Sequence, residues 1–76
     1  MTGEEFAKIR KGLDLTQEEL GNKVGLSRVT IGKIERSRTV SAVHSNLIGY
    51  VQLAKAVREY NASAERMVLA VNGDMQ

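Results

Sequence analysis

Apolar residues recur along the chain at the spacing of helices. Three pairs lie three or four positions apart with polar residues between them: Phe6 and Ile9, Leu20 and Val24, and Ile31 and Ile34. A longer stripe follows at Leu47, Val51, Ala54 and Val57, with an apolar run at residues 67–71. Spacing of three and four residues is typical of amphipathic helices, and no segment shows the alternation of a strand. The pattern therefore predicts an all-α fold.

Two helix starts carry the same capping signal. Thr2 is followed by Glu5, and Thr16 is followed by Glu19, each three residues later. In such a capping box, the hydroxyl and the carboxylate each accept a hydrogen bond from a backbone N–H at the start of the helix. Gly12 is placed to end the first helix in a left-handed turn.

Residues 16–36 predict two short helices joined by a tight turn. Gly25 supplies a positive φ at no steric cost, and Ser27 offers a cap for the next helix only two residues later. Gly21 lies where the third helix must approach the second closely. Two helices joined in this way describe a helix-turn-helix.

The third helix is expected to have one apolar and one polar face. The inward side chains of the motif are Leu20, Val24, Leu26, Ile31 and Ile34. The positions expected to face outward on the third helix are Arg28, Val29, Thr30, Gly32, Lys33 and Arg36. An ordinary helical hairpin would explain the inward set but not the basic outward one.

Charge is concentrated in the same segment. Residues 23–38 hold five basic side chains against Glu35 alone, a net charge of +4 within a chain whose net charge is +2. A basic segment on a near-neutral body indicates an anionic partner that touches one face. The other interpretation is a solvated helix surface.

Composition excludes several classes of function. A chain of 76 residues suits one domain, residues 1–76, and the absence of cysteine excludes disulfides and thiolate metal sites. No apolar run could span a membrane and the N-terminus has no signal-peptide core, so we expect a cytoplasmic, nucleoid-associated protein. His44 has no cluster of metal ligands around it in the sequence, and no nucleophile–base set is evident. We therefore expect no metal, no cofactor and no enzymatic activity.

The segment "IRKGLDLTQEELGNKVGLSRVTIGKIER" resembles the Cro/repressor-type (XRE-like) helix-turn-helix family of small phage and bacterial transcriptional regulators. The resemblance implies a compact, lambda-repressor-like bundle of five helices that binds double-stranded DNA and pairs with a second copy. It also implies that Gln17 bonds a phosphate and braces the recognition helix, and that Arg10 and Glu35 form an ion pair.

The third helix then becomes the recognition helix, because an α-helix fits the major groove of B-DNA. The residues expected to contact bases are Ser27, Arg28, Val29, Thr30 and Lys33, although Ser27 is also a cap. Those expected to contact phosphates are Gln17, Arg36 and Arg38.

The chain departs from the family pattern after Arg36. The segment 37–46 is longer than usual and has no proline. It either extends the fourth helix backwards from a Ser41 cap or forms a loop along the DNA backbone. Val40 and Val43 are then anchors under that loop or dimer contacts.

The C-terminal region 47–73 is expected to carry dimerisation. A fifth helix capped by Asn61 or Ser63 holds more apolar residues than one face needs, and large apolar patches usually mark interfaces. The predicted interface residues are Tyr60, Met67, Val68 and Val71. The alternative is that these residues are internal core.

Together these features predict a sequence-specific transcriptional regulator, a repressor or autoregulator that binds a two-fold-symmetric, palindromic operator as a homodimer and can contact RNA polymerase. The alternative is a protein-interaction module, antitoxin-like or polymerase-binding, built on the same fold. Neither interpretation involves a membrane.

Overall fold

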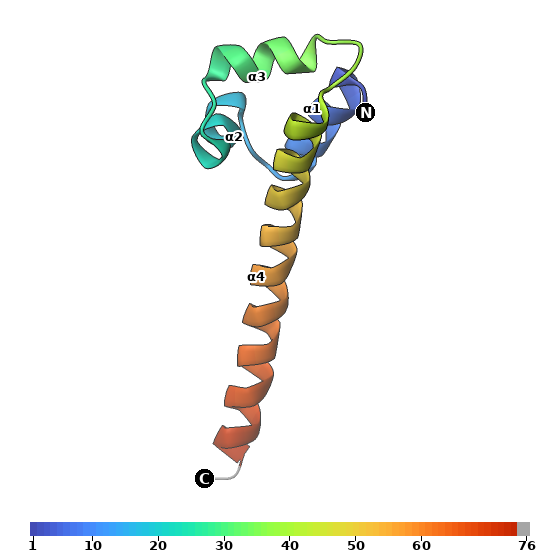
Figure 1. Ribbon diagram of the computed structural model, residues 1–76. Helices are drawn as coiled ribbons and strands as arrows, with labels where there is room; N and C mark the ends of the chain where they lie inside the picture. The colour runs from blue at the N-terminus through green and yellow to red at the C-terminus, as the bar shows by residue number, and fades with distance from the viewer. Residues whose placement is uncertain (75–76) are drawn as a thin grey trace.

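Four helices make up the described part of the chain (Figure 1). In this computed structural model the backbone is described for residues 1–74 and the side chains for residues 1–61. The helices are α1 (Gly3–Gly12), α2 (Gln17–Val24), α3 (Arg28–Glu35) and α4 (Ala42–Asp74), and the described residues contain no strand. The prediction of an all-α fold is confirmed.

The molecule has a globular head and a long stem. The head consists of α1, α2, α3 and the first turns of α4, and the rest of α4 projects away from it (Figure 1). The dimensions along the principal axes are 57 × 20 × 17 Å. We call the part of α4 from Ala54 onward the stem.

The short helices begin where the capping signals predict. The Thr2 hydroxyl accepts a hydrogen bond from the Glu5 N–H, and the Thr16 hydroxyl accepts one from the Glu19 N–H, at 3.1 Å each. Both capping boxes are complete. Because a box satisfies N–H groups that have no partner inside the helix, it fixes where the helix starts.

The end of α1 differs from the prediction. Gly12 lies inside α1, and the residue with positive φ is Asp14, at 59°. An aspartate tolerates the left-handed region better than most residues because its side chain is short and polar. Gly12 is the last residue of α1, but the expectation that it makes the left-handed turn is wrong, since Asp14 makes it.

The expectation of five helices is not confirmed. Residues 42–74 form one continuous helix in place of the predicted fourth and fifth helices. Asn61 and Ser63 can cap a helix, but a cap does not interrupt one, and no proline or glycine lies nearby to break α4.

One apolar core holds the head together. Phe6 comes from α1, Leu20 from α2, and Ile31 and Ile34 from α3, and all are buried. Val40, Ile48 and Val51 complete the core from the loop and from α4. The sequence pattern predicts an apolar stripe through Leu47 and therefore misses Ile48, which is only 1% exposed.

Close backbone approach requires glycine at position 21. A Cβ atom there would lie 2.3 Å from the Leu26 carbonyl oxygen in the turn before α3. This agrees with the expected close approach of the second and third helices. At position 12, by contrast, a Cβ atom would meet nothing within 4 Å.

We expect Gly21→Ala to lower the free energy of unfolding by about 3 kcal/mol, because the backbone at Leu26 must shift to admit the methyl group. Gly12→Ala is the matched control and should raise it by about 0.5–1 kcal/mol, since alanine favours the helix. Urea denaturation followed by circular dichroism measures both. An unchanged midpoint for Gly21→Ala would contradict the close packing of α2 on the turn.

Candidate nucleic-acid interface

The tight turn between α2 and α3 positions the exposed helix of the motif. Gly25 has φ of 76°, as its place in the sequence predicted, and the Leu26 N–H donates to the Gly21 carbonyl oxygen at 2.9 Å. Ser27 then caps α3, with its hydroxyl accepting a hydrogen bond from the Thr30 N–H at 3.1 Å. The turn and the cap together set the direction in which α3 leaves α2.

The two faces of α3 differ sharply. Ile31 and Ile34 are buried against α1 and α2, whereas Arg28 and Lys33 are exposed and Val29 is 60% exposed. The apolar face thus orients the helix, and the opposite face carries cations and one aliphatic side chain.

Gly32 does not face outward as expected. It is buried, and a Cβ atom there would lie 3.3 Å from the Arg36 Nη1 and 3.8 Å from the Gln17 Nε2. The Arg36 guanidinium and the Gln17 amide therefore both lie over this glycine, and together they cover it.

The two hydroxyl groups among the predicted base contacts are engaged with each other. The Ser27 Oγ and the Thr30 Oγ1 are 2.9 Å apart, in addition to the capping bond. Thr30 is half-buried, so its accessible surface is smaller than that of Arg28, Val29 and Lys33. The latter three present the larger exposed side chains of the predicted base-contact set.

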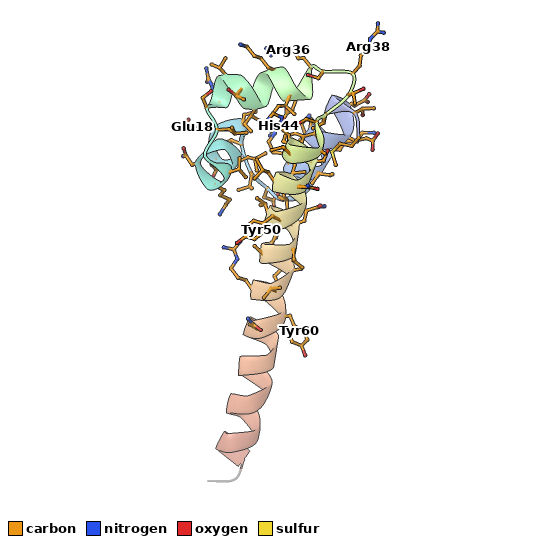
Figure 2. All side chains as sticks on the ribbon, viewed as in Figure 1. Glu18, Arg36, Arg38, His44, Tyr50 and Tyr60 are labelled. Atoms are coloured by element: carbon orange, nitrogen blue, oxygen red, sulfur yellow. The ribbon has the colours of Figure 1, made fainter. Side chains whose placement is uncertain are left out.

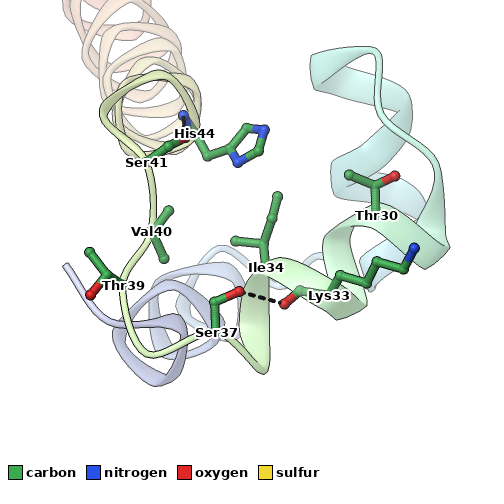
Figure 3. Close-up of a pocket in the computed structure, with 8 residues that line it drawn as sticks. All are labelled: Thr30, Lys33, Ile34, Ser37, Thr39, Val40, Ser41 and His44. Carbon is green, nitrogen blue, oxygen red and sulfur yellow. Dashed lines mark hydrogen bonds between the residues drawn. The ribbon is translucent and has the colours of Figure 1, made fainter.

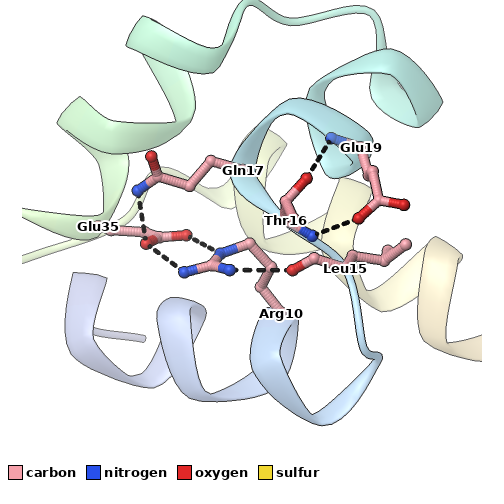
Figure 4. A network of polar contacts seen from close by, with 6 residues as sticks. All are labelled: Arg10, Leu15, Thr16, Gln17, Glu19 and Glu35. Atoms are coloured by element: carbon pink, nitrogen blue, oxygen red, sulfur yellow. Dashed lines mark hydrogen bonds and ion pairs between the residues drawn. The ribbon is translucent and has the colours of Figure 1, made fainter.

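A polar network locks the far end of α3 to α1 and α2 (Figure 4). The Arg10 Nε lies 2.6 Å from the Glu35 Oε2, and the Arg10 Nη2 donates to the Glu35 Oε1 at 3.1 Å. The Gln17 Nε2 donates to the same Oε1 at 3.1 Å, and the Arg10 Nη1 donates to the Leu15 carbonyl oxygen at 2.9 Å. The structure therefore brings Arg10, Gln17 and Glu35 together, with the Gln17 amide against α3.

The network sets the charge state of Glu35. Burial raises the pKa of its carboxyl, but the hydrogen bonds from Arg10 and Gln17 and the charges of Arg10 and Lys11 outweigh burial. The pKa of Glu35 is therefore lower than its ordinary value of 4.5. At neutral pH, Glu35 is a paired carboxylate whose charge is neutralised locally by Arg10.

Arg36 and Arg38 lie beyond the last turn of α3. Both are exposed and project from the end of the head opposite the stem (Figure 2). The structure thus places these predicted phosphate contacts on the same end of the molecule as α3 itself.

A cleft lies between α3 and the first turn of α4 (Figure 3). Its lining residues are Thr30, Lys33, Ile34, Ser37, Thr39, Val40, Ser41 and His44. The Ser37 hydroxyl donates to the Lys33 carbonyl oxygen at 2.9 Å, and the Ser41 hydroxyl accepts from the His44 N–H at 3.2 Å. Ser37 and Thr39 have no role in the predictions from sequence, although serine and threonine are frequent after α3 and indicate a polar lining there.

The segment after α3 follows the first of the two predicted alternatives. Ser41 caps α4, which begins at Ala42. Val40 is buried, and its N–H donates to the Met1 carbonyl oxygen at 2.8 Å, whereas Val43 is 67% exposed. Val40 is therefore the anchor of the loop, and Val43 lies free on α4.

The predicted interface residues lie on the stem. Tyr60 is 74% exposed. Met67, Val68 and Val71 lie in the helical backbone of α4 but outside the residues whose side chains are described.

Among the helices that the structure describes, none combines the length and the hydropathy of a membrane span.

These features define a helix-turn-helix DNA-binding domain: two short helices at a glycine turn, with the second held by its inner face. A model of the helix-turn-helix family matches residues 6–43, and the chain belongs to this Cro/C1-type, XRE-like family. The family is one of DNA-binding regulators rather than of enzymes. Neither the curated proteins nor the solved structures yielded a match.

The ion pair makes stability depend on pH. Because the pKa of Glu35 is lowered by folding, its contribution is complete above about pH 4.5 and is lost as pH falls through the lower, folded-state pKa. We expect Glu35→Gln to cost about 2–4 kcal/mol at pH 7, since it leaves Arg10 without a countercharge. The cost should shrink steadily below pH 4.5.

Urea denaturation of both proteins between pH 3 and pH 7 measures the difference. Glu18→Gln removes the same charge from an exposed position on α2 and is the matched control (Figure 2). A difference between Glu35→Gln and the unaltered protein that stays constant with pH would contradict the proposed charge state.

Proposed function

We propose that the protein is a sequence-specific regulator of transcription that binds a two-fold-symmetric operator in double-stranded DNA as a homodimer. In this proposal it acts as a repressor, including of its own gene, by occupying DNA that polymerase needs. The observation that carries the proposal is the exposed face of α3, where Arg28, Val29 and Lys33 project from a helix whose other face is buried.

The chemistry of that face suits base edges in the major groove. Arginine and lysine donate to the O6 and N7 atoms of guanine, arginine as a bidentate pair. Valine packs on the methyl group of thymine in the same way as other small apolar groups. Arg28, Val29 and Lys33 lie on the first two turns of α3, the part of a recognition helix that approaches the bases.

The surroundings of α3 suit the phosphate backbone. Arg36 and Arg38 extend the cationic surface beyond the helix, and phosphate contacts fix the position of a protein on DNA without reading sequence. The cleft beside α3 is lined by Thr39 and Ser41, whose hydroxyl groups are of the kind that commonly donate to phosphate oxygens. The Ser37 hydroxyl already donates to the Lys33 carbonyl oxygen. We assign Gln17 a phosphate contact as well, made from its brace position at the start of α2.

A protein-interaction module is the second candidate. The exposed apolar side chains of α4, such as Tyr50 and Leu53, favour a protein contact at that helix. They do not account for the cations on α3, so we place protein contact on α4 and DNA contact on α3. A contact with polymerase is compatible with both.

Selection of bound duplexes from a random pool, at ~150 mM salt, tests the proposal. We expect a symmetric site with guanine in each half. On that site Arg28→Ala and Lys33→Ala should each lose about 1–3 kcal/mol of discrimination at one base position. Lys8→Ala, which removes an exposed cation from α1, is the control and should keep the preference of the unaltered protein.

Recovery of no common sequence, with binding that disappears as salt rises, would overturn the specific-operator proposal. It would leave partner-dependent or protein-directed binding as the better account.

Arg36→Ala should behave differently from Arg28→Ala. Because Arg36 is assigned to a phosphate, its removal should weaken binding to all duplexes alike and reduce the salt slope by about one unit. Fluorescence anisotropy at several salt concentrations, on the selected site and on a scrambled one, measures both effects. A loss of affinity confined to the selected site would show instead that Arg36 reads bases.

A further inference from the structure

Helix α4 has two opposite faces in different surroundings. One face packs against the head through Ile48 and Val51, which are 1% and 6% exposed. The other face carries large apolar side chains in solvent, with Tyr50 at 70% and Leu53 at 62% exposure. The head therefore leaves large apolar side chains of α4 uncovered.

The exposed apolar residues of α4 follow a heptad pattern. They are Val43, Tyr50, Leu53, Val57 and Tyr60. From Tyr50 onward the intervals are three and four residues in alternation, which is the spacing of the a and d positions of a coiled coil. We call this line of residues the seam.

The sequence continues the seam beyond the residues whose side chains are described. With Tyr50 and Val57 at a and Leu53 and Tyr60 at d, the next positions fall on Ala64, Met67 and Val71. The backbone stays helical to Asp74, so the register holds along the stem. A helix of 33 residues is about 50 Å long, enough for several heptads.

Charged residues avoid the seam. Between residues 50 and 71 they are Lys55, Arg58, Glu59, Glu65 and Arg66, all at positions b, c or f of the register. Lys55 and Glu59 form an ion pair with each other, at 3.9 Å, rather than reaching across the helix. Between residues 50 and 71, the charged residues are therefore confined to the positions away from the seam, and the seam positions are free of charge.

Uncharged residues border the seam, since the e positions fall on Leu47, Ala54, Asn61 and Val68. The g positions hold Gly49, Ala56, Ser63 and Ala70. Charged residues at e and g usually select a partner of opposite charge. The absence of charged residues at e and g argues against a charged partner helix. An uncharged seam is matched by the same seam on a second copy of the chain.

The described side chains of the stem beyond Lys55 have no support from the head. From Ala56 to Asn61 every residue is exposed. An isolated helix depends on packing of an apolar face for most of its stability. Covering Tyr50 and Tyr60 alone would bury roughly 300 Å² per protomer toward the ~800 Å² of a standard interface.

We propose that two copies of the chain pair along this seam as a parallel, in-register coiled coil, with the heads side by side at one end. The orientation rests on the proposed function. Helix α3 lies across the end of the molecule opposite the C-terminus (Figure 1), so a parallel pair presents both recognition helices at the same end. An antiparallel pair would place them at opposite ends of the stem, where one duplex could not meet both.

The proposal changes the expected interface in a specific way. The sequence pattern predicts dimerisation at Tyr60, Met67, Val68 and Val71 near the C-terminus. The seam adds Tyr50, Leu53 and Val57, so that pairing begins close to the head. Pairing next to the head fixes the spacing of the two α3 helices more tightly than contact at the far end of the stem.

Disulfide trapping without DNA tests the proposal. The chain has no cysteine, so an introduced thiol is the only one present. In the parallel arrangement, Val57→Cys faces its own counterpart across the seam, at a separation suited to a disulfide. Mild oxidation should therefore shift Val57→Cys from the monomer to the dimer band on a non-reducing gel.

Glu59→Cys places the thiol on the outer face two residues away and should remain at the monomer band.

Sedimentation of the unaltered chain should give the mass of a dimer. The double variant Leu53→Glu with Val57→Glu should give the mass of a monomer whose head remains helical. A dimer mass without Val57→Cys cross-linking would overturn the parallel register. A monomer mass for the unaltered chain at tens of micromolar would overturn the pairing itself.

These outcomes are separate from those of the DNA experiment. Trapping of Val57→Cys with no selected operator would retain the coiled coil and reject the regulator. Selection of a half-site that is bound by a monomer would retain the sequence-specific regulator and reject the coiled coil.

Discussion

The carboxylate of Glu35 is the contact on which the geometry of the head depends. It belongs to α3 but is held by Arg10 from α1 and by Gln17 from α2, so one side chain joins three helices. A carboxylate with 9% side-chain exposure would be costly if it were unpaired. The two oxygen atoms accept three hydrogen bonds, which repay that cost and fix the angle of α3. The apolar core beneath sets where α3 lies, and the network sets how it is turned.

The same pairing shapes the charge of the outer surface. Glu35 is the only acid in the basic segment, and the structure turns it inward against Arg10. Its negative charge is neutralised inside the head, so the exposed face of α3 keeps the full effect of Arg28, Lys33 and Arg36. An acid that would oppose DNA binding at the surface thus stabilises the helix that carries the cations.

Local signals in the sequence predicted much of the head. Capping by Thr2, Thr16 and Ser27 and the left-handed turn at Gly25 depend only on neighbouring residues, so the pattern was sufficient to place them. Gly12 was misread because two residues, Gly12 and Asp14, could both make the left-handed turn, and a short aspartate did so. The register of α4 depended on which neighbours it met. Ile48 and Leu47 are both apolar, and only the position of the head decided that Ile48 is buried.

The stem shows a further limit of local signals. Asn61 and Ser63 have the residue types of helix caps, yet capping chemistry describes how a helix can start and not whether the preceding one must stop. The exposure of the candidate site residues was predicted better than their contacts with one another. The sequence pointed to Arg28, Val29 and Lys33 as exposed on the third helix, and the family resemblance pointed to Gln17 as its brace. Gly32, however, was expected to face outward and not to lie under Arg36 and Gln17. The Gln17 amide reaches Gly32 from another helix, so this contact depends on how α2 and α3 meet and not on a local pattern.

The head and the stem use opposite kinds of chemistry for their proposed partners. Attraction between the cations of α3 and DNA phosphates weakens as salt rises, because counterions compete for the phosphates. The seam of α4 has no charge to screen, and its apolar contacts are unaffected or strengthened by salts such as sulfate. Since the charged residues of the stem lie away from the seam, the two interfaces do not share a dependence on ionic strength. The proposed dimer would therefore leave DNA as salt rises and still remain paired, so that rebinding would need one encounter and not the reassembly of two copies.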